Sequence, residues 1–488
     1  MTDNVSEKFL KGVSVQTLVS LANGILQIVV FAIFSRLLSR IDFGYYAALM
    51  GITTIFMGIS YAGIGSAVIQ QKQLTDKYCS TAFTISIITG LFVGIVFFLL
   101  TDSLAHFVLD EKLKEPLRWM TIPLVLYSIN GFAGSLLSRE LRFGTAGIIK
   151  IISYSTSAIV GIFYAYYVGG VFSLVVLFVL DAITYTILLF SRVGIPKLSI
   201  GAVEAKSVIS FGGWLTLGSL MSTISNQIDK LVLGKWLSVD RLGAYNRPVG
   251  FISNIIGQIN TIFDTVLFPI LSGFQDSKEQ FRRILYSSFG LLTTMGTMLA
   301  LMLFFNSKLI IHIFFGNEWL DLVPILQISS LSAIFMLNNT LADCFYRSFN
   351  LVKIGFFIRM GGIVLTLLFM SIGAQYDILG VTVAILLSNL VVVICKFIYL
   401  CYKSNASLGQ LMIIALRSWK PSIPVLLLGL VLLLLPQSIM SEIIVAIILS
   451  GLCLLLLVRF PRFVGEEYTT LIYPKVEVLA AKLHLMRK

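Results

Sequence analysis

Two adjacent charged residues, Asp229 and Lys230, stand inside the segment STISNQIDKLVLGKWL (residues 222–237), whose surroundings are apolar enough to cross a membrane. Arg247 follows in the next apolar segment. A charge at bilayer depth costs a few kcal/mol unless it faces water or a partner. At 1.5 Å per residue, Lys230 and Arg247 lie roughly 8–9 Å from the same end of their helices. We expect both cations to bind an anionic phosphate group, with Asp229 holding or releasing them; a static Asp229–Arg247 ion pair is the alternative.

A row of polar residues predicts a wet environment for this segment. Four of them recur at i, i+3, i+7 and i+10, on one helix face: Ser219, Ser222, Asn226 and Asp229. A polar face on an apolar helix is typical of a cavity lining rather than of a lipid contact. Asn226 therefore joins the expected substrate-binding residues, and Asp229 joins the candidates for coupling to an ion.

Further charges lie in apolar segments nearer the other side of the membrane. Arg359 is early in one segment, and Lys396 is late in the next. Three more polar residues step along a third segment at i, i+4 and i+8: Asn339, Asp343 and Arg347. Together these residues can form a second, inner loading site, with Arg359 and Lys396 binding substrate. The alternative is that the cations snorkel to the interface along their apolar stems.

Asp181 stands near the centre of the apolar sequence VFSLVVLFVLDAITYTILLF, with no cation nearby in the sequence. Thr184 and Tyr185, one turn further on, can hydrogen-bond it. Because burial favours the neutral form of a carboxylate, this position suits reversible protonation. We predict that Asp181 is an ion-coupling site, with Asp264 as a weaker candidate. The alternative is a structural aspartate with satisfied hydrogen bonds.

The sequence predicts neither a metal site nor a cofactor. Its five cysteines show no CxxC spacing and lie in or near apolar segments, which is typical of small apolar residues rather than of ligands or disulfides. The three histidines, His106, His312 and His484, lie outside the apolar segments. The segments between spans are too short for a soluble catalytic domain, so we expect a protein that is not an enzyme.

The elements that position these residues are expected to be membrane helices. Hydrophobic residues make up 57% of the 488-residue chain and charged residues only 12%, against about a quarter in soluble domains. Apolar segments that can span about 30 Å of hydrocarbon recur along the chain. We predict an all-α polytopic membrane protein with about 14 transmembrane helices. They are expected at residues 12–36, 43–69, 80–100, 117–138, 146–168, 170–191, 209–237, 242–270, 284–305, 324–346, 353–373, 378–401, 421–436 and 441–458.

The distribution of basic residues predicts the orientation. Lys and Arg are concentrated in one set of the predicted loops and towards both ends of the chain. The positive-inside rule then places both termini in the cytoplasm. The net charge of +12 follows from this topology and does not indicate nucleic-acid binding.

The segment around Asp229 repeats an earlier one at a shift of 199 residues without gaps: LLSRIDFGYYAALMG (37–51) aligns with WLSVDRLGAYNRPVG (236–250). Identical pairs include Ser20/Ser219, Gly44/Gly243, Tyr46/Tyr245 and Gly51/Gly250. Such a match predicts duplication, and the shift of six spans makes the copies parallel, as in transporters with a substrate site between two halves. Convergence of two apolar helices is the alternative.

We accordingly expect two parallel-repeat six-helix lobes followed by a hairpin. The expected boundaries are 1–191 for the N-lobe, 192–208 for a cytoplasmic linker, 209–402 for the C-lobe, 403–459 for spans 13 and 14, and 460–488 for a cytoplasmic amphipathic tail.

Three stretches carry a resemblance to a known family: FSRLLSRIDFGYYAALMGI, SRELRFGTAG and DKLVLGKWLSVDRLGAYNRP. They resemble the Wzx-type polysaccharide transporters of the multidrug/oligosaccharidyl-lipid/polysaccharide exporter superfamily, over almost the full chain. The resemblance implies a bacterial inner-membrane protein that flips an undecaprenyl-pyrophosphate-linked oligosaccharide from the cytoplasmic to the outer leaflet by alternating access, for surface polysaccharide biosynthesis. The partners expected with it are the lipid-linked oligosaccharide, membrane lipid and the polysaccharide polymerase machinery, around a monomeric protein.

Three other functions stay open from the sequence. A drug or small-solute exporter of the same superfamily would have a less cationic cavity. A membrane-embedded lipid-sugar polymerase or ligase would need acid/base or nucleophilic groups converging at a membrane face, usually beside a large external loop. A passive scaffold would not need cations at matched depth in two neighbouring spans.

Overall fold

The computed structural model describes the backbone of residues 2–71, 73–107, 111–140, 142–272, 278–349, 351–434 and 438–460. Side chains are described over these ranges except at residues 2–17, 61–62, 107, 211–215, 217–219, 262–270, 272, 278 and 352. The predicted tail therefore lies outside the described residues from 461 onward.

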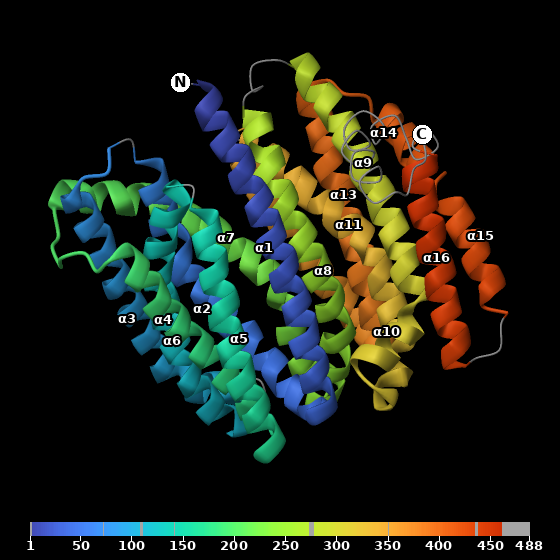
Figure 1. Cartoon of the computed structure of the whole chain (residues 1–488), viewed down its shortest axis with the longest axis horizontal. Helices are drawn as coiled ribbons and strands as arrows, with labels where there is room; N and C mark the ends of the chain where they lie inside the picture. The colour runs from blue at the N-terminus through green and yellow to red at the C-terminus, as the bar shows by residue number, and fades with distance from the viewer. Residues whose placement is uncertain are drawn as a thin grey trace. The chain divides into compact units, whose positions relative to one another are not determined.

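Every regular element in the described ranges is a helix, which confirms the all-α class (Figure 1). The helices are α1 (Thr2–Leu37), α2 (Arg40–Gln70), α3 (Asp76–Phe107), α4 (Lys114–Arg139), α5 (Phe143–Tyr167), α6 (Phe172–Val193), α7 (Ala202–Trp236), α8 (Val239–Ser272), α9 (Lys278–Phe305), α10 (Ser307–Phe314), α11 (Val323–Ser348), α12 (Val352–Gly373), α13 (Asp377–Ser404), α14 (Leu408–Ser418), α15 (Ser422–Leu432) and α16 (Ile439–Arg459), with short 3-10 turns at Glu111–Leu113, Asn317–Leu322 and Ala374–Tyr376.

Each predicted apolar segment coincides with one of these helices, whereas α10 and α14 were not predicted. Both are too short to cross a membrane, so a search for long apolar segments passes over them. In the described residues, ten segments are long and apolar enough to span, one of which holds both α12 and α13, and the bent pair α14–α15 makes up to eleven. The count of fourteen is therefore not confirmed. Neither α7 nor α8 is among the ten, and both helices include residues whose side chains lie outside the described part of the chain.

The chain forms two compact units, Met1–Arg247 and Pro248–Lys488. In the first unit α7 packs along α2 in the opposite direction, since Gly51 faces Lys230 and Gly58 faces Thr223. The division by contacts falls within α8. The lobe and linker boundaries predicted from the repeat describe a different kind of division, and they stay a prediction.

Two glycines related by the repeat allow the starts of α2 and α8 to touch. A Cβ atom on Gly44 would lie 1.9 Å from the Val239 carbonyl oxygen, and one on Gly243 would lie 2.0 Å from the Arg40 carbonyl oxygen. Arg40 and Val239 are themselves one repeat shift apart. The contact is thus reciprocal, as at a two-fold interface between two copies of one element. This geometry supports the duplication that the sequence predicts.

Polar contacts fix the ends of the helices in the first unit. Arg139 from α4 donates to the backbone carbonyls of Val68 (2.9 Å) and Ile69 (3.2 Å), at the negative end of α2. After α6, the backbone amide of Gly201 donates to the Thr81 hydroxyl of α3 at 3.0 Å. The segment between α6 and α7 is therefore held against the start of α3.

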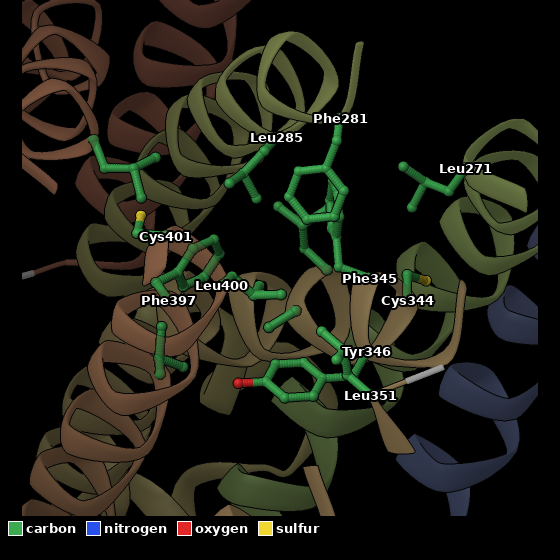
Figure 2. Close-up of a cluster of buried hydrophobic side chains, with 14 of the residues drawn as sticks. Leu271, Phe281, Leu285, Cys344, Phe345, Tyr346, Leu351, Phe397, Leu400 and Cys401 are labelled. Atoms are coloured by element: carbon green, nitrogen blue, oxygen red, sulfur yellow. The ribbon is translucent and has the colours of Figure 1, made fainter. Parts of the chain in front are cut away.

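The second unit is built around α9, α11 and α13. Figure 1 shows α14, α15 and α16 lying along α9, at one edge of this group. Its central apolar cluster includes Phe281, Phe345 and Leu400, all buried (Figure 2). Tyr346 lies at the edge of that cluster, with its hydroxyl directed toward the helix that carries Phe397.

Candidate functional site

The Arg247 side chain is completely buried, at 0% exposure. Its guanidinium lies between two aromatic rings, 3.7 Å from the centroid of Phe31 and 3.2 Å from that of Phe43. It also donates to the Ser35 hydroxyl and to the Phe31 carbonyl. A cation on an aromatic face is stabilised by the ring quadrupole, most strongly when it is desolvated. We expected Arg247 to bind an anionic phosphate group, and in this structure it is packed between α1 and α2 instead.

Asp229 is hydrogen-bonded to Tyr245, whose hydroxyl donates to the carboxylate at 2.8 Å. The static Asp229–Arg247 ion pair is therefore not the arrangement seen. Lys230 is half-buried and donates to the Gln227 side chain at 2.9 Å. Asn226 is exposed, whereas the Ser219 side chain lies outside the described residues. The sequence did carry a signal for Tyr245, because it is the repeat partner of Tyr46.

A second cluster of charges, here called the α11–α13 charge cluster, consists of Lys396, Asp343, Asn339 and Arg359. The Lys396 ammonium donates to Asp343 at 2.6 Å and to the Asn339 amide oxygen at 2.7 Å. Arg359 donates to the other carboxylate oxygen of Asp343 at 2.9 Å. The structure thus brings together residues of three helices that the sequence assigned to one inner site.

The alternative that Lys396 snorkels does not fit the structure, because its side chain is only 1% exposed. The carboxylate of Asp343 replaces the water that a snorkelling ammonium would reach. Arg347 is exposed, and its guanidinium also contacts the Asp343 carbonyl and the Cys344 sulfur, both at 3.4 Å. Arg359 is intermediate, with 23% of its side chain exposed.

Asp181 is buried at 8% exposure in the first unit. The Ser153 hydroxyl donates to one carboxylate oxygen at 2.8 Å and the Tyr127 hydroxyl to the other at 3.4 Å. The expected partner Thr184 bonds to the Leu180 carbonyl of its own helix instead. The partners of Asp181 therefore come from α4 and α5, which local spacing could not reveal. The Asp264 side chain lies outside the described residues.

The described residues contain no candidate metal site, because no group of three or more His, Cys, Asp or Glu among them could hold an ion. The five cysteines are free thiols. The helices position hydrogen-bonded cations and carboxylates within otherwise apolar segments. Such groups can bind an anion or exchange a cation without covalent chemistry.

A match to a sequence family identifies the family of this chain. Residues 33–324 match the family described as "Polysaccharide biosynthesis protein". The chain belongs to this family. The lipopolysaccharide biosynthesis protein WzxC of Escherichia coli K12 is 24% identical over 67% of this chain and 67% of its own length. The teichuronic acid biosynthesis protein TuaB of Bacillus subtilis 168 is 23% identical over 68% of this chain and 69% of its own.

Solved structures place this polysaccharide biosynthesis protein among membrane transporter folds. The lipid II flippase MurJ in an inward closed conformation superposes with a TM-score of 0.70 at 16% identity, over 92% of this chain and 98% of MurJ. An inward-facing multidrug resistance MATE transporter gives a TM-score of 0.60 at 14% identity, over 80% and 98%. The resemblance that the sequence motifs predicted is confirmed, and so is the transporter fold.

Proposed function

We propose that this protein flips a lipid-linked oligosaccharide across the membrane by alternating access, for surface polysaccharide biosynthesis. The observation that carries the proposal is the fold: a member of a polysaccharide biosynthesis family has the fold of a lipid II flippase over 92% of its length. The cargo expected from the resemblance is an undecaprenyl-pyrophosphate-linked oligosaccharide. Its pyrophosphate needs a cationic, hydrogen-bonding path, and its prenyl tail can stay in lipid.

Five residues are proposed to bind this substrate: Lys230, Arg247, Arg359, Lys396 and Asn226. Exposed Asn226 and half-buried Lys230 are accessible as the structure stands. Arg247 is buried, so it can bind substrate only in a second state in which Phe31 and Phe43 no longer enclose it. Alternating access supplies such states, because a ligand selects the conformation that exposes its site.

The proposed setting is the cytoplasmic membrane of a bacterium, with both termini in the cytoplasm and the substrate moving outward. Basic loops on one side support this orientation. We propose that the protein is a monomer, that it hands its product to the polysaccharide polymerase machinery, and that it performs no covalent reaction. Asp181 and Asp229 are the proposed sites for ion coupling.

Drug export is the second candidate, because multidrug transporters share this fold. The family match and the cations buried in the apolar layers favour the oligosaccharide.

Deletion of the gene in its own host tests the proposal. We expect a lipid-linked oligosaccharide to accumulate in the inner leaflet, where a membrane-impermeant oxidant of sugars added outside spheroplasts does not reach it; mass spectrometry then identifies the glycan. Loss of surface polysaccharide without accumulated lipid-linked glycan would contradict the proposal.

A further inference from the structure

The α11–α13 charge cluster contains two cations and one carboxylate, so its net charge is positive. Lys396 and Arg359 both contact the single carboxylate of Asp343, on different oxygens. Asn339 is neutral and accepts from Lys396. Within the cluster, the pair Lys396–Asp343 is therefore already neutral, and Arg359 adds a second positive charge at its open edge.

The two ion pairs differ in how firmly they are held. Lys396 is 1% exposed, and the Tyr346 hydroxyl donates to its backbone carbonyl at 3.1 Å, which ties α13 to α11 at this residue. Removing one partner of a buried ion pair is strongly destabilising, because the other charge is left uncompensated. Arg359 and Asp343 are each 23% exposed, and ion pairs open to water contribute little to stability.

The backbone of α12 allows Arg359 to reach this position. Gly355 and Gly362 lie on its face at i−4 and i+3. A Cβ atom at Gly355 would lie 3.1 Å from the Tyr346 ring, and one at Gly362 would lie 2.8 Å from Val392 of α13. The small residues thus set α12 close to both neighbours, and the guanidinium lies over the carboxylate while part of it stays exposed.

We propose that Arg359 is an exchangeable arm that leaves Asp343 to bind a phosphate or pyrophosphate group, while Lys396 stays on Asp343 as a fixed counter-charge. The inference rests on the proposed function for the identity of the ligand, and it assigns Lys396 a positioning role instead of direct contact. Arg359 can leave because the carboxylate remains compensated. Its planar guanidinium then offers two parallel donors to the phosphate oxygens.

Calorimetric titration of inorganic pyrophosphate into purified protein in phosphatidylcholine nanodiscs tests this exchange. We expect Arg359→Gln to abolish binding. Lys396→Met should weaken binding at least about tenfold, equal to 1.4 kcal/mol, because Arg359 becomes the only partner of Asp343. The double variant Lys396→Met/Asp343→Asn should regain the lost affinity, since Arg359 is then released. A phosphate site that does not depend on exchange predicts no loss in Lys396→Met, and a merely structural network predicts no recovery in the double variant; either result would overturn the proposal.

Two further measurements keep the test decisive. If Lys396→Met does not fold, Asp343→Asn alone should raise pyrophosphate affinity, and unchanged or weaker binding contradicts the proposal. If phosphatidylglycerol in the discs removes the difference between the wild type and Arg359→Gln, the arm serves bulk lipid headgroups and its assignment to a substrate is wrong. Flipping assays on the same variants separate the two claims. Normal flipping by Arg359→Gln rejects the arm alone, and intact pyrophosphate binding without any flipping rejects the proposed function alone.

Discussion

Arg247 is a buried cation whose contribution to stability can be measured separately from its proposed role in substrate binding. Its guanidinium fills the space between Phe31 and Phe43 and donates to Ser35. Arg247→Ala therefore leaves a cavity and two exposed ring faces, and we expect a loss of about 2–4 kcal/mol. Arg247→Lys keeps the charge but loses the planar contact, so an intermediate loss is expected.

The measurement for Arg247 is thermal unfolding of detergent-purified variants, followed by loss of the monodisperse peak. Arg283→Ala, at an exposed position of α9, is the control and should melt like the wild type. An Arg247→Ala variant as stable as this control would show that the aromatic contacts contribute nothing.

Asp181 is one of the two residues proposed to couple flipping to an ion. Its oxygens are hydrogen-bonded by Ser153 and Tyr127, so Asp181→Asn preserves shape and most hydrogen bonds while removing the charge. We expect flipping by the wild type in vesicles to depend on a pH gradient at clamped potential, and Asp181→Asn to lose that dependence. Asp102→Asn, at an exposed site, should retain it. If flipping by Asp181→Asn still depended fully on the pH gradient, Asp181 would be a structural residue only.

At the scale of the residue, the sequence located polar groups better than their partners. Asp181, Asp343 and Lys396 stand out because each interrupts an apolar helix. Their partners lie far along the chain: Ser153 is 28 residues from Asp181, and Phe31 is 216 residues from Arg247. Periodicity reports which residues share a face of one helix and carries no information on which face of another helix meets it.

At the scale of the element, the paired starts of α2 and α8 give a sharp test of the repeat. Gly44→Val or Gly243→Val would place side-chain atoms where backbone oxygens lie within 2.0 Å of a Cβ position. Because backbone cannot yield as a flexible side chain can, we expect each change to lower the yield of folded protein severalfold and to abolish flipping. Gly250→Val is the matched control, since no atom of the described residues outside its own helix backbone and chain neighbours lies within 4 Å of its Cβ position.

Folding yield by fluorescence-detected size exclusion, followed by flipping in vesicles, measures the effect. If Gly44→Val and Gly250→Val behave alike, the close contact between α2 and α8 is not needed. The helices themselves were predictable because apolar segments of membrane length are long and strongly biased in composition. The close packing of α7 on α2 was not, since neighbouring helices in lipid are matched by shape rather than by hydrophobicity.

At the scale of the whole molecule, the driving force follows from the charge of the proposed substrate. A potential negative on the cytoplasmic side supplies about 2.3 kcal/mol per elementary charge moved outward per 100 mV. Two net negative charges would gain about 5 kcal/mol on the same basis. We expect imposed potentials of opposite sign, set by valinomycin and potassium gradients, to speed and slow flipping. Equal rates under both signs would mean that consumption of the product on the far side draws the flux.

Flipping of a lipid-linked oligosaccharide by the purified protein tests the central claim most directly. Vesicles carrying fluorescent undecaprenyl-pyrophosphate oligosaccharide in both leaflets are treated with a membrane-impermeant enzyme that cleaves the glycan. Protein-free vesicles should protect the inner-leaflet half, whereas vesicles with the wild-type protein should lose that protection and those with Arg359→Gln should keep it. Protection unchanged by the wild-type protein, together with extrusion of a cationic dye from the same vesicles, would contradict the account and identify a drug exporter.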